Sequence, residues 1–160
     1  MKVINNFLNK NIHKKIKDLL FSGNFPWYYN DFVAGKLDNK NFFFTHTLIR
    51  EEKTNSGYCD FFLKPILEKI SYKKLIRAKI NCYTKSQKKI KSAFHVDQVN
   101  NHTVLLYNVN TNNGYTLFKK NNKKIYSLEN SLIIFNGNKE HCSVSQTDEK
   151  LRININININ

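Results

Sequence analysis

Leu151-Arg152-Ile153-Asn154-Ile155-Asn156-Ile157-Asn158-Ile159 is a strictly alternating stretch near the end of the chain. Side chains of a β-strand point alternately to its two faces, so one face carries isoleucines and the other carries Arg152 and asparagines. We expect the isoleucine face to pack under N-terminal helices and the polar face to look into a wet cavity between two sheets. An ordinary surface strand with a polar outer face has the same pattern and is the competing interpretation.

The segments before this strand are also mostly β in character. From residue 75 onward, about eight short strands follow one another at roughly ten-residue spacing, with turn signals between them. We place these strands at 75–83, around 95–97, and at 102–109, 115–118, 124–128, 132–135, 141–145 and 151–159. Asn112-Asn113-Gly114 is expected to be a hairpin turn. Without alternation of helices and strands, this pattern predicts a sandwich or jelly roll.

The first 74 residues carry the helical signals. Four apolar residues at helical spacing predict a helix over 9–22: Ile12, Ile16, Leu19 and Leu20. A second helix is expected over 59–70, with Pro65 inside it, and the aromatic stretch 41–49 is expected to be a strand. We therefore predict one domain, 1–160, that is mainly β, with N-terminal helices in a support region (1–74) and a β core (75–160).

The charge balance is strongly basic. The chain has 26 Lys+Arg against 12 Asp+Glu, which gives a formal net charge of +14. Such a balance is found in nucleic-acid-binding proteins, but here the lysines are scattered along the whole chain and do not form a stripe. Nucleic acid is therefore the less favoured partner.

Compartment signals point to the cytoplasm. The three cysteines, Cys59, Cys82 and Cys142, are odd in number and contain no C-x-x-C pair, which argues against a disulfide framework and a zinc site. No run of eighteen apolar residues is present and the N-terminus lacks an unbroken apolar core, so we expect neither a membrane span nor a signal peptide.

The chemistry-bearing stretch is Phe94-His95-Val96-Asp97. On a strand, residues two apart point to the same face, so His95 and Asp97 are expected to lie side by side. An imidazole and a carboxylate are two of the three ligands in the 2-His-1-carboxylate triad that holds non-haem Fe(II). His141 is the candidate for the third ligand. Solvent-exposed histidines without a metal are the competing interpretation.

Arg152 follows His141 and opens the last strand. A fixed guanidinium there can pair bidentately with the far carboxylate of a dicarboxylic co-substrate. A facial triad leaves three metal positions open, which suit a chelating 2-oxo acid and dioxygen. We expect the hydroxyl of Tyr83 to face the same cavity and to add a hydrogen bond.

Several local segments, besides these residues, resemble the Fe(II)/2-oxoglutarate-dependent dioxygenases of the prolyl 4-hydroxylase-like type. Asn81-Cys82-Tyr83 stands where that family places a tyrosine that touches 2-oxoglutarate. The stretches 105–110 and 114–118 resemble two of its strands, and 132–135 followed by His141 resembles its order of apolar strand, short loop and histidine. The whole chain, including 25–31 and 110–116, is similar to small oxygenases of this type from marine phages and their bacterial hosts.

The resemblance implies a double-stranded β-helix, a jelly roll of the cupin-like kind. It implies that His95, Asp97 and His141 are the catalytic iron ligands and that Arg152 binds the C5 carboxylate of 2-oxoglutarate. It also places Tyr83 and Asn108 beside this co-substrate, although relatives often carry an aromatic residue at the position of Asn108. The loop 84–92 departs from the family because it lacks the glycines that many relatives have there. O2 is implied as a second co-substrate and ascorbate as a candidate reductant.

The activity implied is hydroxylation of a C–H bond in a protein residue or small molecule, with release of succinate and CO2. The substrate stays open among peptides, amino acids and small metabolites. One alternative is a nucleic-acid oxidative demethylase, which the net charge favours; that branch usually carries a second arginine six positions after the first, where this chain has Asn158. The other alternative is a non-catalytic jelly-roll binding protein.

Overall fold

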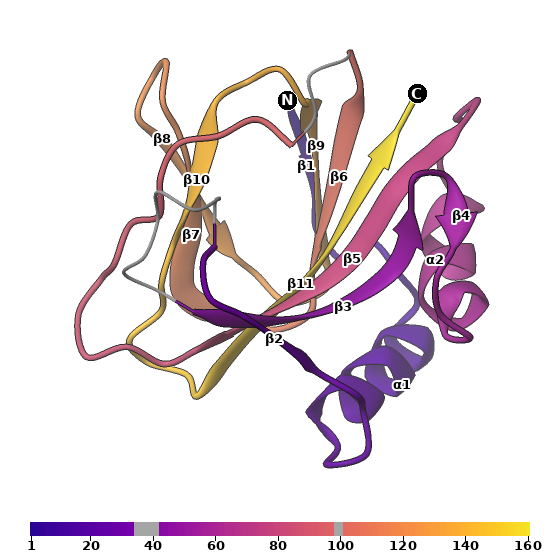
Figure 1. Ribbon diagram of the computed structural model, residues 1–160, viewed down its shortest axis with the longest axis horizontal. Helices are drawn as coiled ribbons and strands as arrows, with labels where there is room; N and C mark the ends of the chain where they lie inside the picture. The colour runs from indigo at the N-terminus through magenta and orange to yellow at the C-terminus, as the bar shows by residue number, and fades with distance from the viewer. Residues whose placement is uncertain (34–41, 98–100) are drawn as a thin grey trace.

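The computed structural model describes residues 1–33, 42–97 and 101–160. Figure 1 shows two facing sheets, with both helices on the outer side of the larger one. The elements, in chain order, are β1 (Lys2–Ile4), α1 (Lys10–Phe21), β2 (Tyr28–Asn30), β3 (Phe43–Arg50), β4 (Lys53–Thr54), α2 (Cys59–Leu67), β5 (Leu75–Thr84), β6 (Thr103–Asn108), β7 (Asn112–Phe118), β8 (Lys123–Ser127), β9 (Ser131–Asn136), β10 (His141–Val144) and β11 (Leu151–Ile159).

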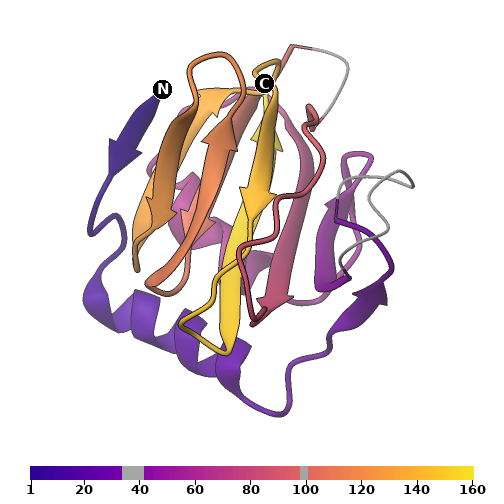
Figure 2. The same cartoon turned by 90° about the vertical axis from the view of Figure 1, so that its left-hand side faces the viewer.

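The larger sheet has the strand order β1-β9-β6-β11-β5-β3-β2, with β4 paired to the edge of β3, and the smaller sheet has the order β10-β7-β8. Every strand pair is antiparallel, and Figure 2 shows the strands of the smaller sheet in front of β11. The predicted mainly β jelly roll with N-terminal helices is confirmed. β11 is central, because β5 and β6 flank it on either side.

The isoleucine face of β11 forms the main core. Its four isoleucines (Ile153, Ile155, Ile157 and Ile159) are at most 4% exposed and belong to one apolar cluster with residues of α1 and α2. Ile16 of α1 and Phe62 of α2 lie in that cluster. Burying each isoleucine contributes about 1.5–3 kcal/mol, so the strict alternation both forms the strand and fixes which face the helices cover. The predicted packing is confirmed.

Helix α1 begins after Asn9, whose side-chain oxygen accepts a hydrogen bond from Asn11 N at 2.9 Å. Its buried residues are His13, Ile16 and Leu20, whereas Ile12 is 40% exposed. Ile16 and Leu20 are buried as predicted and Leu19 packs against the core, so the helix differs from the prediction only at its first core position, where His13 is buried and Ile12 is not. The reason is a hydrogen bond. His13 Nδ1 lies 2.7 Å from the hydroxyl of Tyr107 on β6, so His13, and not the neighbouring Ile12, is turned toward the sheet.

The predicted hairpin turn at 112–114 is wrong in its topology. These residues begin β7, which belongs to the smaller sheet, whereas the preceding β6 belongs to the larger one, so the chain crosses between sheets instead of folding back. Gly114 N does donate to Asn112 Oδ1 at 3.0 Å, but this local turn sits in a bulged strand. Asn110 fixes the crossover, because its side chain accepts from Ile153 N and donates to Leu151 O on β11.

Other differences are smaller. The predicted loop 50–57 contains the short strand β4, and the helix predicted to reach residue 70 ends at Leu67. Asn41, the first residue of the predicted strand 41–49, lies outside the described residues. The strands β1 to β4 precede residue 75 and join the larger sheet; the division of one domain into a support region and a core stays a prediction. Within the described residues, neither helix has the length and apolarity needed to cross a membrane.

Candidate metal centre and anion site

The backbones of His95 and His141 are hydrogen-bonded to each other. The segment around residues 91–95 runs antiparallel beside β10, where His95 N donates to His141 O at 2.9 Å and His141 N donates to His95 O at 3.0 Å. Only isolated bridges form here, so the strand predicted around 95–97 is wrong as an element, although its pairing brings the two histidines together. The two imidazole rings lie 4.8 Å apart, centre to centre.

Both imidazoles are oriented in the same way. His95 Nδ1 lies 3.2 Å from the carbonyl oxygen of Ala93, and His141 Nδ1 lies 2.9 Å from that of Lys139. A carbonyl oxygen can only accept, so each Nδ1 carries a hydrogen and the lone pair of the neutral ring is on Nε2. This is the arrangement in which a histidine binds a metal through Nε2.

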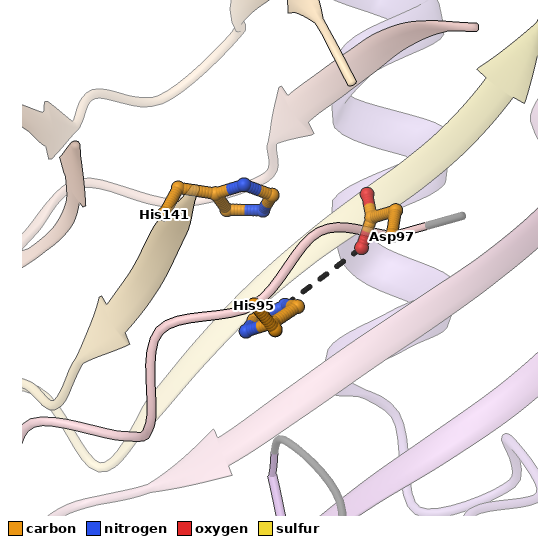
Figure 3. A group of neighbouring side chains, drawn as sticks. All are labelled: His95, Asp97 and His141. Carbon is orange, nitrogen blue, oxygen red and sulfur yellow. Dashed lines mark ion pairs between the residues drawn. The ribbon is translucent and has the colours of Figure 1, made fainter. Parts of the chain in front are cut away.

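Asp97 completes the group (Figure 3). One potential ligand atom from each of His95, Asp97 and His141 lies within 4.8 Å of the others, and Asp97 Oδ1 is 3.8 Å from His95 Nε2. The side chain of Asp97 is only 4% exposed. Two nitrogen lone pairs and one carboxylate at this spacing can surround a single ion of the Fe(II) or Zn(II) size class.

Strand β11 and strand β5 hold the carboxylate of Asp97. Asn156 Nδ2 donates to Asp97 Oδ2 at 3.0 Å, and Asn158 Nδ2 lies 3.4 Å from the same oxygen. Arg77 Nη2 of β5 lies 3.5 Å from Asp97 Oδ1. Carboxylate ligands of metal sites are commonly fixed by such outer hydrogen bonds.

The protonation states suit metal binding. Burial works to raise the pKa of Asp97, but His141, Arg77 and the Asn156 hydrogen bond outweigh it, and the pKa falls below its ordinary value. Burial lowers the pKa of His141, and the proximity of His95 and His102 adds to this against the attraction of Asp97. Near neutral pH the pair is therefore a carboxylate and a neutral imidazole, the forms that coordinate.

The polar face of β11 looks into a cavity of about 50 Å³ between the two sheets, lined by His95, Asp97 and His141 together with Arg152, Asn154 and Asn156. The predicted cavity is confirmed, and the interpretation of β11 as a surface strand is wrong, because Arg152 is only 1% exposed. The same face continues onto β5, where Tyr83 is the register partner of Arg152 and Lys79 that of Asn156. Asn81 Oδ1 and Asn156 Oδ1 are buried without a hydrogen-bond partner among the described residues.

Arg152 is a buried cation, and its hydrogen-bond acceptors in the described part of the chain are all neutral. Its Nε donates to Ser127 Oγ at 2.9 Å, and its Nη1 donates to Ser143 Oγ at 2.8 Å and to Val144 O at 3.0 Å. Among the residues that the structure describes, no carboxylate pairs with it. Burying an unpaired charge is costly, so this guanidinium is positioned to receive an anion.

Of the two residues expected beside the co-substrate, Tyr83 lines the cavity and Asn108 does not. Tyr83 lines the cavity, its ring centre is 5.4 Å from the guanidinium carbon of Arg152, and burial raises its pKa, so its hydroxyl stays protonated. Asn108 faces the same side of the larger sheet, as the register partner of Asn154, but its amide donates to Ser131 Oγ at 3.1 Å. Asn108 is 1% exposed and is not among the cavity-lining residues.

The sequence alone did not identify the residues that hold Asp97, which are Asn156, Asn158 and Arg77. It also did not identify Lys79, a second cation that lines the cavity. Asn156 and Asn158 share the strand face of Arg152, so the alternation that identified the face contained the signal. Arg77 and Lys79 likewise alternate with Tyr83 along β5. What the sequence lacked was the register that sets β5 beside β11.

Solved structures of other proteins share this fold, among them two prolyl hydroxylases and one 2OG-Fe(II) oxygenase family protein. The chain matches a prolyl hydroxylase from Trichoplax adhaerens, solved in complex with a peptide fragment of the hypoxia inducible factor oxygen degradation domain, at a TM-score of 0.62 and 13% identity over 99% of this chain and 82% of that one. A 2OG-Fe(II) oxygenase family oxidoreductase from Burkholderia pseudomallei matches at 0.61 and 11% over 91% and 78%. A Pseudomonas putida prolyl-4-hydroxylase matches at 0.66 and 9% over 99% and 91%.

In sequence, no protein-family model and no curated protein matches the chain. The likeness therefore lies in the fold, and at this level it confirms the resemblance drawn from the local segments.

Proposed function

We propose that this chain is an Fe(II)- and 2-oxoglutarate-dependent dioxygenase of the prolyl 4-hydroxylase-like type. The observation that carries the proposal is the meeting of three donor atoms, from His95, Asp97 and His141, within 4.8 Å in a cavity that also contains Arg152, a cation without a carboxylate partner among the described residues. Two imidazoles and one carboxylate match the ligand set of non-haem Fe(II) oxygenases. The shared fold of three solved oxygenases supports it.

His95, Asp97 and His141 would hold the iron. Their donor types fit it, since both Nε2 lone pairs are free and Asp97 is ionised. Bound Fe(II) supplies the redox chemistry that activates O2. The chain itself would supply three protein ligands, the number that leaves coordination positions for a co-substrate in such oxygenases.

Arg152 would bind the C5 carboxylate of 2-oxoglutarate. Ser127, Ser143 and Val144 O hold Nε and Nη1, so the direction of the guanidinium is set before any ligand arrives. Tyr83 would donate from its neutral hydroxyl to the same co-substrate. A contact from Asn108 would require its amide to leave Ser131.

The proposed reaction consumes 2-oxoglutarate, O2 and a substrate C–H bond, and it yields succinate, CO2 and the hydroxylated product. One oxygen atom enters succinate and the other enters the product, so atoms and electrons balance without a further reductant; ascorbate would only restore iron that has become oxidised. We assign this activity to one domain, 1–160. The substrate class is a protein residue or a small molecule.

Spectroscopy tests the site before a substrate is known. Anaerobic addition of Fe(II) and then 2-oxoglutarate is expected to give a weak visible charge-transfer band. The band should be lost in His95→Ala and kept in Asp18→Asn, an exposed acidic residue on α1. An absent band in the folded wild-type protein would contradict the proposal.

Turnover separates an enzyme from a non-catalytic jelly-roll binding protein. Succinate release, measured over peptide, amino-acid and nucleotide pools, is expected to require both iron and O2. A band without iron-dependent succinate release under any of these conditions would favour the binding protein. Base demethylation with salt-sensitive DNA binding would favour the nucleic-acid demethylase.

A further inference from the structure

A second cation faces the cavity from β5. Lys79 is the register partner of Asn156, the residue whose amide holds Asp97, and it lines the same cavity as His95, Asp97 and His141. The backbone of Lys79 is therefore level with the residue that holds Asp97.

Among the described residues, Lys79 has no acidic partner. Its ammonium lies 5.3 Å from the ring centre of Phe43, and none of the ion pairs of the described part of the chain includes it. The nearby carboxylate of Asp97 is already approached by Arg77, Asn156 and Asn158. Burial and the charge of Arg77 lower the pKa of Lys79 to about 8 against the pull of Asp97, so at neutral pH it is mostly a desolvated ammonium.

Lys79 and Arg152 start from different levels of the larger sheet. Along β11 the partners of Tyr83 and Lys79 are Arg152 and Asn156, four residues apart, which is about 13 Å of strand at about 3.3 Å per residue. A five-carbon keto acid that reaches Arg152 with one end and the metal with the other has both ends held, so the ammonium of Lys79 is left for a second ligand.

The sum of the charges in the loaded cavity also leaves Lys79 available for a second ligand. The charges of Fe(II), Asp97, Arg152 and a doubly ionised 2-oxoglutarate cancel. Lys79 then adds a positive charge to the loaded cavity and has no carboxylate partner in the described part of the chain, whereas Arg77 contacts Asp97. A neutral substrate would have to enter beside an uncompensated ammonium, whereas a carboxylate would neutralise it.

We propose that Lys79 binds a carboxylate of the primary substrate, so that the enzyme oxidises carboxylic acids. This inference rests on the proposed function and deepens it. The carboxylate belongs either to a free acid, including amino acids, or to an acidic side chain of a peptide. Both sources present the same group to the ammonium, and the experiment separates them.

Binding is measured without turnover. Calorimetric titrations are run anaerobically on protein loaded with Mn(II) and 2-oxoglutarate, using free L-amino acids and aliphatic carboxylic acids, each against its primary amide. A parallel arm uses end-blocked peptides with Asp or Glu against Asn or Gln, and a third arm uses nucleoside monophosphates. We expect acids of one of the first two arms to bind about tenfold or more tightly than their amides, equivalent to about 1.4 kcal/mol.

Variants identify the residue. Lys79→Met is expected to remove the preference for acids over amides, and Lys79→Arg to restore part of it. Lys15→Met, which removes an exposed charge on α1, serves as the control with unchanged binding. The same binding acids should stimulate succinate release by the iron-loaded protein, with KM rising about tenfold in Lys79→Met.

Four results would overturn the inference while leaving the proposed function intact. In the wild-type protein these are amides that bind as well as acids, binding by nucleotides, and binding by no acid at all. The fourth is a Lys79→Met variant with weakened affinity for 2-oxoglutarate. The last would assign Lys79 to the co-substrate. A failure of the proposed function is distinguishable, because it would appear in the wild-type protein as a missing 2-oxoglutarate band.

Discussion

Asn156 Nδ2 donates a 3.0 Å hydrogen bond to Asp97 Oδ2, and this contact ties the candidate metal carboxylate to the central strand of the larger sheet. Asp97 itself lies in an irregular segment beside residues 98–100, outside any strand. Its direction therefore depends on partners from elsewhere. β11 supplies these partners from the face opposite its buried isoleucines, so the strand that organises the core also positions the site.

Asn156→Ala tests this tie. We expect metal affinity to fall about 10- to 100-fold, because a ligand that loses its outer hydrogen bond is free to rotate away from the metal. Asn158→Ala is the matched variant: it removes the longer 3.4 Å contact to the same oxygen and should weaken metal binding less. Competition titrations of Fe(II) or Mn(II) measure both. Equal affinities in the wild type and Asn156→Ala would show that Asn156 does not position Asp97.

Arg152→Met tests the anion site. Loss of a charge-assisted hydrogen-bond pair costs about 1.5–3 kcal/mol, so the dissociation constant for 2-oxoglutarate should rise roughly 10- to 150-fold. Arg152→Lys keeps the charge but loses the fork that Ser127 and Ser143 orient, and we expect an intermediate value. Titration of the charge-transfer band gives these constants.

Arg50→Met, an exposed arginine at the end of β3, is the control for a general loss of positive charge. An unchanged dissociation constant in Arg152→Met would contradict the role of Arg152.

Much of the fold was predictable because its signals are local. The alternation of 151–159 gave the bounds of β11 and the identity of both faces, since period-two burial needs no knowledge of distant partners. The candidate ligands were likewise predictable, because the residue types in H-x-D and a later histidine define the donor atoms in any backbone conformation. The structure brings His95, Asp97 and His141 within 4.8 Å without the strand that was expected to carry the first two.

The rest depends on pairings between distant segments. Asn112-Asn113-Gly114 reports a local backbone turn, and nothing local says whether the next strand returns to β6 or crosses to the other sheet. Lys79 and Asn156 are 77 positions apart in the sequence and become neighbours only through the β5–β11 register. His13 was hidden in the same way, because its partner Tyr107 is 94 positions away.

Gly114→Ala probes the support of Arg152. A Cβ at Gly114 would lie 2.9 Å from Arg152 Cδ and 3.1 Å from Val144 O, the carbonyl that accepts from Arg152 Nη1. We expect a loss of stability of about 1–3 kcal/mol from overpacking, together with weaker 2-oxoglutarate binding, since the guanidinium must shift. Chemical denaturation and band titration measure the two effects.

Gly57→Ala adds the same methyl where nothing lies within 4 Å, and it should change neither quantity. A Gly114→Ala protein with wild-type stability and co-substrate affinity would show that this close approach is not needed.

Glu129 gives a pH dependence that is independent of the metal site. Its carboxylate contacts His13 Nε2 at 3.0 Å and Lys17 Nζ at 2.5 Å, and so ties α1 to the segment before β9. Burial works to raise the pKa of Glu129, but the hydrogen bonds and charges of Lys17 and His13 outweigh it, so the net shift is downward. The unfolded chain therefore takes up a proton at a higher pH than the folded one. It follows that the stabilisation is present above the ordinary glutamate pKa of about 4.3 and is lost as pH falls through the lower folded value.

Glu129→Gln should accordingly be less stable than the wild type at pH 7, and the difference in urea midpoint should shrink as pH falls below about 4.3. The difference should also shrink at about 1 M salt, because the Lys17–Glu129 pair is partly exposed. Glu149→Gln, at an exposed residue, is the control and should show little difference at any pH. A difference that grows toward low pH would mean that the folded protein favours the protonated carboxyl, the opposite of what the contacts of Glu129 with Lys17 and His13 require.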